Sequence, residues 1–200
     1  YLNGHSDMVG GIALVKDDGL AERLQFILNA AGAVPGPFDA CLALRGPKRL
    51  HLRMRQHDVN GRAIARFLVD KVGAESVMYV GLPSHPQHDL AKRQMSGFGG
   101  MISIELGTRD RAAHLHKRVR VFSLAESLGG VESLISHPAS MTHASVPPEN
   151  RLKLGISHGL VRLSCGVEET EDLLTDLDRA FDGIPGASAP GAPRREKASV

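Results

Sequence analysis

The spacing of apolar residues changes near Val77, and this change constrains the fold more than any other feature of the sequence. Before it, apolar residues recur every three or four positions, as in the stretch 20–31. After it, apolar and polar residues alternate, and residues 101–106 carry Ser103 and Glu105 on one face. Spacing of the first kind is typical of helices and spacing of the second kind of half-buried strands. The sequence therefore predicts an α/β domain in which helices pack on a mixed, mainly antiparallel sheet.

The same patterns predict where the individual elements lie. We expect helices over 20–31, 38–44, 47–72, 86–95, 109–118 and 168–181, and strands over 8–15, 77–80, 101–106, 119–124 and 160–167. Pro47 suits the first turn of a helix, where its missing N–H has no partner to lose. We place a domain boundary near Gly46, and we expect residues 183–200, rich in Gly and Pro, to form a disordered tail.

Composition argues against several classes of function. No apolar run reaches the ~18 residues of a membrane-spanning helix, so no membrane contact is expected. The net charge is +2, from 24 basic and 22 acidic residues, and aromatic residues make up 4%. This balance does not favour nucleic acid as a partner. Cys41 and Cys165 lie far apart without a CxxC motif, which favours a reducing compartment and hence a cytoplasmic location. The ten histidines lack metal-ligand spacing, so no metal site is expected.

Two segments carry side chains that a scaffold alone does not require. Residues 124–134 follow an expected strand and place Glu126 and Ser127 beside a glycine pair. Arg162 stands inside an apolar strand. An arginine there can face water, paired with a surface carboxylate such as Glu168, or it can bind a ligand's carboxylate through two parallel hydrogen bonds. Periodicity leaves both interpretations open.

Several stretches together resemble a known family. They are Tyr-Leu-Asn-Gly-His-Ser-Asp-Met-Val-Gly-Gly at 1–11, Gly-Pro-Phe-Asp at 36–39, Leu-Arg-Gly at 44–46, Leu-Arg-Met at 52–54, Gly-Leu-Pro-Ser-His-Pro-Gln-His at 81–88, Arg-Gln-Met-Ser-Gly-Phe-Gly-Gly-Met at 93–101 and Leu-Ala-Glu-Ser-Leu-Gly-Gly-Val-Glu-Ser-Leu at 124–134. From residue 1 to about residue 181 the chain is similar to the cystathionine γ-lyases and γ-synthases, which use pyridoxal phosphate in cysteine and methionine metabolism.

The resemblance implies a fold, two domains and the place of the lysine that binds the cofactor. It implies the fold type I of pyridoxal phosphate enzymes, with residues 1–46 ending the large cofactor domain and residues 47–182 forming the small C-terminal domain. The lysine that binds the cofactor is expected directly before Tyr1, so no catalytic or cofactor-binding residue is expected within residues 1–200. The family also implies a homotetramer, built as a dimer of dimers.

For the substrate, the resemblance implies four residues. Arg162 would hold the α-carboxylate of an amino acid, with Ser127 at the same carboxylate. Glu126 would face the distal part of the substrate, and Thr142 would line the mouth of the site. The sequence departs from the family pattern in four places: His158 stands where Asp is usual, Cys165 where Val is usual and Pro47 where Leu is common, and residues 107–110 form a shortened loop.

The implied activity is cleavage of the Cγ–S bond of cystathionine to give cysteine, 2-oxobutanoate and ammonia. The alternative is a cystathionine γ-synthase, or a related γ-substitution on an O-acylhomoserine. A second alternative, from another class, is a non-catalytic small-domain fragment that acts in binding or oligomerisation.

Overall fold

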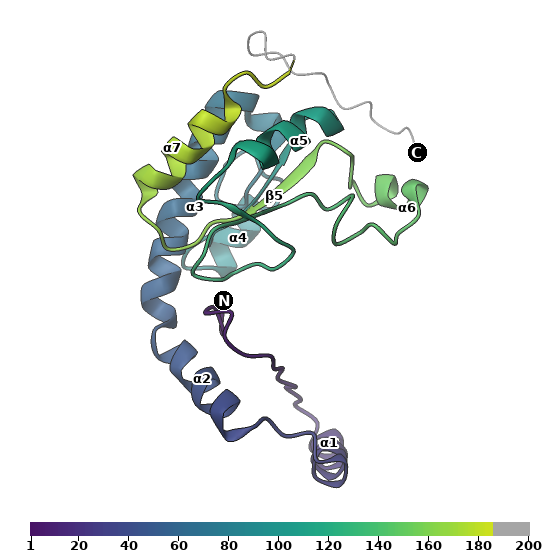
Figure 1. Ribbon diagram of the computed structural model, residues 1–200. Helices are drawn as coiled ribbons and strands as arrows, with labels where there is room; N and C mark the ends of the chain where they lie inside the picture. Colours follow the sequence, from purple (N-terminus) through teal and green to yellow (C-terminus); the bar gives the residue numbers. More distant parts are fainter. Residues whose placement is uncertain (186–200) are drawn as a thin grey trace. The chain divides into compact units, whose positions relative to one another are not determined.

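A computed structural model describes residues 1–185, which form two compact units (Figure 1). One unit is Leu2–His51, and the other joins Tyr1 to the chain from Leu52 onward. The tail expected over 183–200 lies, apart from its first three residues, outside the described residues. The assignment of residues 1–46 and 47–182 to two domains of the family stays a prediction.

The unit Leu2–His51 contains two helices, α1 (Asp18–Ala31) and α2 (Pro37–Lys48). The side chain of Asp17 accepts a hydrogen bond from the Leu20 N–H at 2.7 Å, which caps the start of α1. Gly32 ends α1 in the left-handed conformation, with φ at 67°. No residue of α1 is buried, and Phe26 is 73% exposed.

The strand expected over 8–15 is wrong. These residues run as irregular chain, and they pair with none of the strands in the described part of the protein. A strand needs a neighbour to satisfy its backbone N–H and C=O groups, and apolar composition alone does not provide one. Val9, Ile12 and Leu14 are accordingly exposed.

The helix expected to begin at Pro47 begins instead at Leu50, as α3 (Leu50–Val72). Pro47 lies in the last turn of α2, and Arg49 is the residue that caps that helix. Because proline has no backbone N–H, it weakens the hydrogen-bond ladder of the helix that contains it. The proline therefore marks the end of one helix rather than the start of the next.

The unit from Leu52 onward is built on one five-stranded sheet. Its strands are β1 (Val77–Met78), β2 (Met101–Glu105), β3 (Ser123–Leu124), β4 (Leu134–Ser136) and β5 (Leu160–Ser164). They lie in the order β1-β2-β5-β4-β3, and every pair is antiparallel except β3 with β4. The mixed, mainly antiparallel sheet expected from the sequence is confirmed, with the three strands near 77, 101 and 160 side by side.

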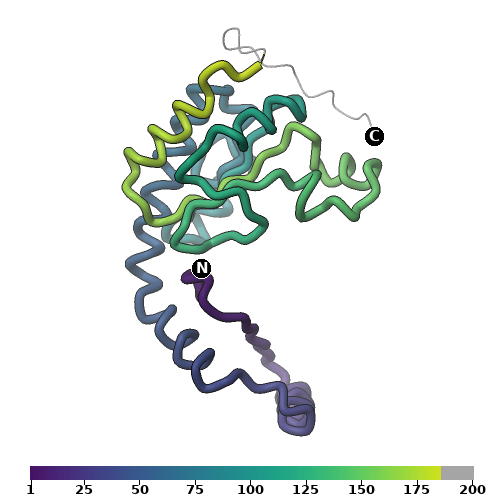
Figure 2. Tube along the Cα trace, in the orientation of Figure 1, coloured from purple at the N-terminus to yellow at the C-terminus, as the bar shows by residue number. Residues whose placement is uncertain are grey.

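The helices α3, α5 (Arg109–Arg118) and α7 (Thr170–Phe181) pack on one face of this sheet. The remaining helices are η1 (Ala74–Ser76), α4 (His88–Gln94) and α6 (Pro148–Lys153). The core joins α3, α5 and α7 to the strands through Ile64, Leu68, Ile102, Ile104, Leu115, Ile135, Val161, Leu163, Leu173 and Leu177. The helix α7 lies beside α3 (Figure 1 and Figure 2), and the rings of Phe67 and Phe181 meet at 6.2 Å.

Alternation along the strands decides which residues reach the opposite face. In β2, Ile102 and Ile104 point into the core while Ser103 and Glu105 do not. In β5, Val161 and Leu163 are fully buried in the core, so Arg162 between them projects from the other face. This second face of the sheet carries the candidate site.

Candidate functional site

Arg162 lies at the centre of β5, between two serines on the neighbouring strands. Ser103 of β2 and Ser136 of β4 are its direct cross-strand partners. Directly opposed residues project from the same face, so both serines stand on the side of the sheet that Arg162 occupies. The arginine is half-buried there.

The guanidinium of Arg162 is held by the segment that follows β3. Its Nη2 donates to the carbonyl oxygen of Glu126 at 2.6 Å and to that of Ser127 at 3.2 Å. The structure thus brings together three of the residues that the sequence singled out. It does so through the main-chain carbonyls of Glu126 and Ser127. The side chains of Glu126 and Ser127 are exposed.

The alternative partner for Arg162, Glu168, is engaged elsewhere. Its carboxylate accepts from the Ser133 N–H at 2.6 Å and from the Ser133 hydroxyl at 2.8 Å. Within residues 1–185, Arg162 forms no ion pair, and its Nε and Nη1 form no hydrogen bond. A half-buried cation that forms no close ion pair is suited to bind an anion from outside the chain.

Burial lowers the pKa of the Arg162 guanidinium, and the negative charge of Glu126 opposes that shift. An arginine stays protonated at neutral pH in spite of such shifts. The site therefore presents a positive charge at all working pH values.

The segment around Glu126 is fixed at both ends. On the side before it, Asp176 of α7 accepts from the backbone N–H groups of Arg120, Val121 and Phe122 at 2.8 to 3.1 Å. On the side after it, the Gly129 N–H donates to the Ser164 hydroxyl at 2.8 Å. Because both ends are tied to the sheet unit, the two carbonyls that hold Arg162 are preorganised.

Thr142 is not brought to the arginine. It is exposed in the turn that follows β4, and its hydroxyl lies 2.8 Å from Nδ1 of His143. No contact in the described chain joins Thr142 to Arg162, and its place at the mouth of a site stays a prediction. His158 and Cys165, two of the departures, lie beside β5: His158 is exposed, and Cys165 is fully buried in the core.

Sequence reasoning missed a cluster that surrounds Tyr1. The Arg53 guanidinium donates to the Tyr1 carbonyl at 2.7 Å, and the Tyr1 hydroxyl accepts from the Gly100 N–H at 2.9 Å. The ring of His57 lies 4.8 Å from that of Tyr1. Arg53 and His57 are buried polar residues one turn apart on α3, and Asn60 on the same face is buried as well. Polar residues at helical spacing on the face that packs inward are the signal that could have identified the cluster.

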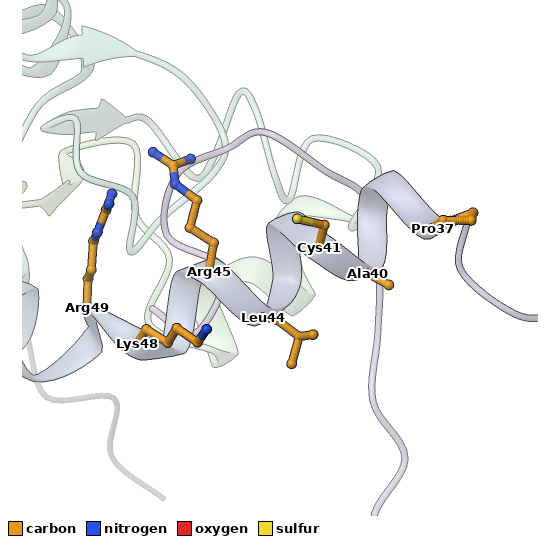
Figure 3. A pocket seen from close by; sticks show the side chains of 7 residues that line it. All are labelled: Pro37, Ala40, Cys41, Leu44, Arg45, Lys48 and Arg49. Carbon is orange, nitrogen blue, oxygen red and sulfur yellow. The ribbon is translucent and has the colours of Figure 1, made fainter.

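A hollow of about 580 Å³ lies along α2 in the unit Leu2–His51 (Figure 3). Its lining comes from α2 and the residue that caps it: Pro37, Ala40, Cys41, Leu44, Arg45, Lys48 and Arg49. None of the residues singled out by sequence contributes to it. Because a single helix lines it, it offers no converging groups from a second element.

Residues 1–185 contain neither a cluster of metal-binding side chains nor a helix that could span a membrane. No group of three metal-binding side chains comes together in that range. None of the helices described is both long and apolar enough to cross a lipid bilayer.

Comparison with known proteins gives a consistent answer. The profile of the family described as "Cys/Met metabolism PLP-dependent enzyme" matches residues 1–182. The chain is 53% identical to a cystathionine gamma-lyase of Dictyostelium discoideum, over 91% of this chain and 47% of that protein. It is 54% identical to a cystathionine gamma-synthase of Mycobacterium bovis, over 90% of this chain and 46% of that protein.

A solved structure shares the fold. The crystal structure of cystathionine gamma-lyase from Lactobacillus plantarum, complexed with L-serine, matches with a TM-score of 0.86 and 43% identity, over 92% of this chain and 48% of that one. The chain spans about half the length of the curated relatives it matches. The fold expected from the resemblance is thereby confirmed, and this chain belongs to the Cys/Met metabolism enzymes that depend on pyridoxal phosphate.

Proposed function

We propose that the polypeptide containing this chain cleaves the Cγ–S bond of cystathionine, with pyridoxal phosphate as cofactor. The overall change adds water and releases cysteine, 2-oxobutanoate and ammonia. The observation that carries the proposal is the guanidinium of Arg162, which is half-buried and held by two carbonyls, and which forms no close ion pair within residues 1–185. Such a group fits the α-carboxylate of an amino acid.

Arg162 would orient the substrate as well as bind it. Nη2 donates to the carbonyls of Glu126 and Ser127, and the N–H groups of Nε and Nη1 stay open. A fork of two parallel bonds to the substrate carboxylate would combine one of these with an N–H of Nη2. The two carbonyls fix the plane of the guanidinium, and a fixed plane gives direction to the carboxylate bound against it. Lysine in the same place would keep the charge and lose that direction.

The residues of this chain fit the substrate end of such a site. When bound, pyridoxal phosphate supplies an electron sink that makes bonds at the α and β carbons of an amino acid labile. Glu126, exposed and next to the arginine's anchor, would face the distal part of the substrate. Ser127 would lie at the carboxylate, and Thr142 at the mouth.

The runner-up is a cystathionine γ-synthase, which joins an O-acylhomoserine to cysteine. Relatives of both names match at similar identity, 53% for the lyase of Dictyostelium discoideum and 54% for the synthase of Mycobacterium bovis. The same Arg162 would serve either reaction, because both substrates carry an α-carboxylate. The third candidate, a binding or oligomerisation domain without catalysis, predicts that the intact polypeptide binds no cofactor.

One experiment separates the three. The intact polypeptide, loaded with pyridoxal phosphate, is incubated with cystathionine alone, and separately with an O-acylhomoserine plus cysteine. The proposal predicts 2-oxobutanoate and cysteine in the first reaction, faster than cystathionine forms in the second. The reverse order of rates would assign the synthase. A protein without the visible absorbance of lysine-bound pyridoxal phosphate would support the non-catalytic domain.

We further propose that this polypeptide works in the cytoplasm as a homotetramer, a dimer of dimers. Residues 1–46 would end the cofactor domain, and residues 47–182 would form the small domain. The exposed apolar side chains of the unit Leu2–His51, among them Ile12, Leu14, Phe26 and Ile27, support burial of this unit by further protein.

A further inference from the structure

Four residues that are far apart in the sequence form a closed circuit of contacts. Nδ1 of His57 lies 2.7 Å from the carbonyl oxygen of Cys165. The Cys165 N–H donates to the Gly100 carbonyl at 2.8 Å, and the Gly100 N–H donates to the Tyr1 hydroxyl at 2.9 Å. The Tyr1 ring closes the circuit against the ring of His57, at 4.8 Å and a tilt of 54°.

A hydrogen bond to the Cys165 carbonyl sets the orientation of the His57 ring. A carbonyl oxygen only accepts, so Nδ1 of His57 must carry the hydrogen in the bond to Cys165. The ring is fully buried, and burial lowers the pKa of His57, an effect that the positive charge of Arg53 reinforces. The ring is therefore neutral with one defined N–H, which leaves it a single stable orientation against Tyr1.

The backbone of Tyr1 is held as firmly as its side chain. Arg53, one turn before His57 on α3, donates to the Tyr1 carbonyl at 2.7 Å. Gly129 approaches the other side of the residue, because a Cβ at that position would lie 3.0 Å from the Tyr1 backbone nitrogen. Gly129 also has φ at 72°, a conformation that favours glycine. The ring and the carbonyl of Tyr1 are thus held by α3 and by Gly100, and its nitrogen lies close to Gly129.

We propose that His57 and Arg53 are positioning residues that act through Tyr1 on the residue bonded to its nitrogen. The proposal rests on the proposed function, in which that neighbour is the lysine that binds pyridoxal phosphate. The Tyr1 nitrogen lies close to Gly129, two residues beyond Ser127, and the carbonyls of residues 126 and 127 hold Arg162. The circuit would therefore set the distance between the cofactor's attachment point and the clamp for the substrate carboxylate.

Loss of these contacts should lower the rate of catalysis, because catalysis is sensitive to the distances between reacting groups. A misplacement of about 1 Å between reacting groups can lower a rate by about 100-fold. A purely structural role for His57 predicts something different, namely a lower melting temperature with no change in the chemistry of the bound cofactor. The two roles are separated by the cofactor's own absorbance.

The experiment uses the intact polypeptide loaded with pyridoxal phosphate. His57→Asn removes the ring contact with Tyr1, and His57→Phe keeps a ring but removes the donor to Cys165. His51→Asn, at an exposed position of the same helix, is the matched control. For each protein we would measure the pH titration of the visible cofactor absorbance, and kcat and KM for cystathionine.

We expect both His57 variants to move the midpoint of the absorbance titration and to lower kcat by about tenfold or more, with KM changed less than kcat. The His51 control should match the unchanged protein in all three. Absorbance titrations and kcat values that stay unchanged in both His57 variants, with only the melting temperature lowered, would overturn the proposal.

Where a His57 variant does not fold, Tyr1→Leu opens the circuit from its other side and carries the same expectations. In the double variant of His57→Asn and Tyr1→Leu, the two effects should not add, because both act through Tyr1. Additive effects would overturn the proposal. If the unchanged polypeptide binds cofactor without cleaving cystathionine, the proposed function fails while the absorbance titration still decides this inference. If it binds no cofactor, both fail.

Discussion

At the scale of single residues, the site depends on close approaches that only particular side chains permit. Gly129 is the clearest case, because its positive φ is strained for other residues and a Cβ there would lie only 3.0 Å from the Tyr1 nitrogen. Gly155 has a similar φ, 74°, but open space where its Cβ would lie. A comparison of alanine variants at these two glycines therefore distinguishes the effect of backbone strain from that of steric contact.

We expect Gly129→Ala to lower the free energy of unfolding more than Gly155→Ala does. Strain at positive φ should cost each variant about 1 kcal/mol, and only Gly129→Ala adds a tight contact with the Tyr1 nitrogen. Urea unfolding of the intact polypeptide measures both. Equal losses in the two variants would show that Tyr1 does not lie against Gly129.

A pair of neighbouring histidines, one half-buried and one buried, makes stability depend on pH. The rings of His116 on α5 and His137 after β4 meet at 5.8 Å. Burial, with the neighbouring charge of His137, lowers the pKa of His116 to about 4. In the unfolded chain the pKa is that of an ordinary histidine, about 6.5. Between these two values the unfolded state binds the additional proton, so stability is full above about pH 6.5 and is lost as the pH falls towards about 4.

We therefore expect His116→Gln to flatten the decline in the free energy of unfolding between pH 7 and pH 5, measured by urea titration at both values. His51→Gln, at an exposed position of α3, is the control and should leave the slope unchanged. A slope that His116→Gln does not alter would contradict the lowered pKa.

At the scale of elements, one buried carboxylate connects α7 to the segment that leads into the site. Asp176 is 3% exposed and accepts from three consecutive backbone N–H groups, those of residues 120–122. Asp178 on the same helix pairs only with Lys71, at 2.6 Å, and its side chain is 58% exposed. We expect Asp176→Ala to lower the free energy of unfolding by at least about 2 kcal/mol, because it leaves buried donors without acceptors.

Asp178→Ala is the matched control, and a surface ion pair contributes about 1 kcal/mol at most. Thermal and urea unfolding of the two variants measure the difference. If Asp176→Ala proves no more harmful than Asp178→Ala, then Asp176 does not anchor residues 120–122.

Much of the element order could be predicted, and the failures have physical causes. The helices α1, α5 and α7 and the strands β2 and β5 follow from their periodicity, and residues 109–118 form a helix with the expected bounds. The strands near 77 and 119 are shorter than expected, with two residues each, and α4 begins at His88 rather than at residue 86. The segment 134–136 gave no signal because all three residues of β4 are buried, which removes alternation. The short α6 was missed for lack of length.

The site was predictable only in part. Alternation in β5 puts Arg162 opposite the core, and this much follows from the residues themselves. Its contacts with residues 126 and 127 join parts of the chain that are 36 and 35 positions apart, and no local sequence pattern predicts them. The circuit through Tyr1, Gly100 and Cys165 is of the same long-range kind.

At the scale of the whole molecule, the unit Leu2–His51 exposes apolar side chains that a stable protein would cover. Val9 is 95% exposed and Leu14 84%. If further protein buries this unit, the 200-residue chain expressed alone should associate or aggregate, and the intact polypeptide should sediment as a tetramer. Sedimentation velocity measures both, and a well-folded 21.4 kDa monomer of the 200-residue chain would argue against burial by other protein.

The central claim is that Arg162 holds the substrate carboxylate, and kinetics of Arg162→Ala in the intact, cofactor-loaded polypeptide test it most directly. We predict that kcat/KM for cystathionine falls by about 100-fold, or about 3 kcal/mol, with KM raised. Arg162→Lys, which keeps the charge and loses the planar fork, should recover only part of the loss. Melting temperature and cofactor absorbance should stay as in the unchanged protein. Activity within about threefold of the unchanged protein, or loss of cofactor and of folding together, would show instead that Arg162 is structural.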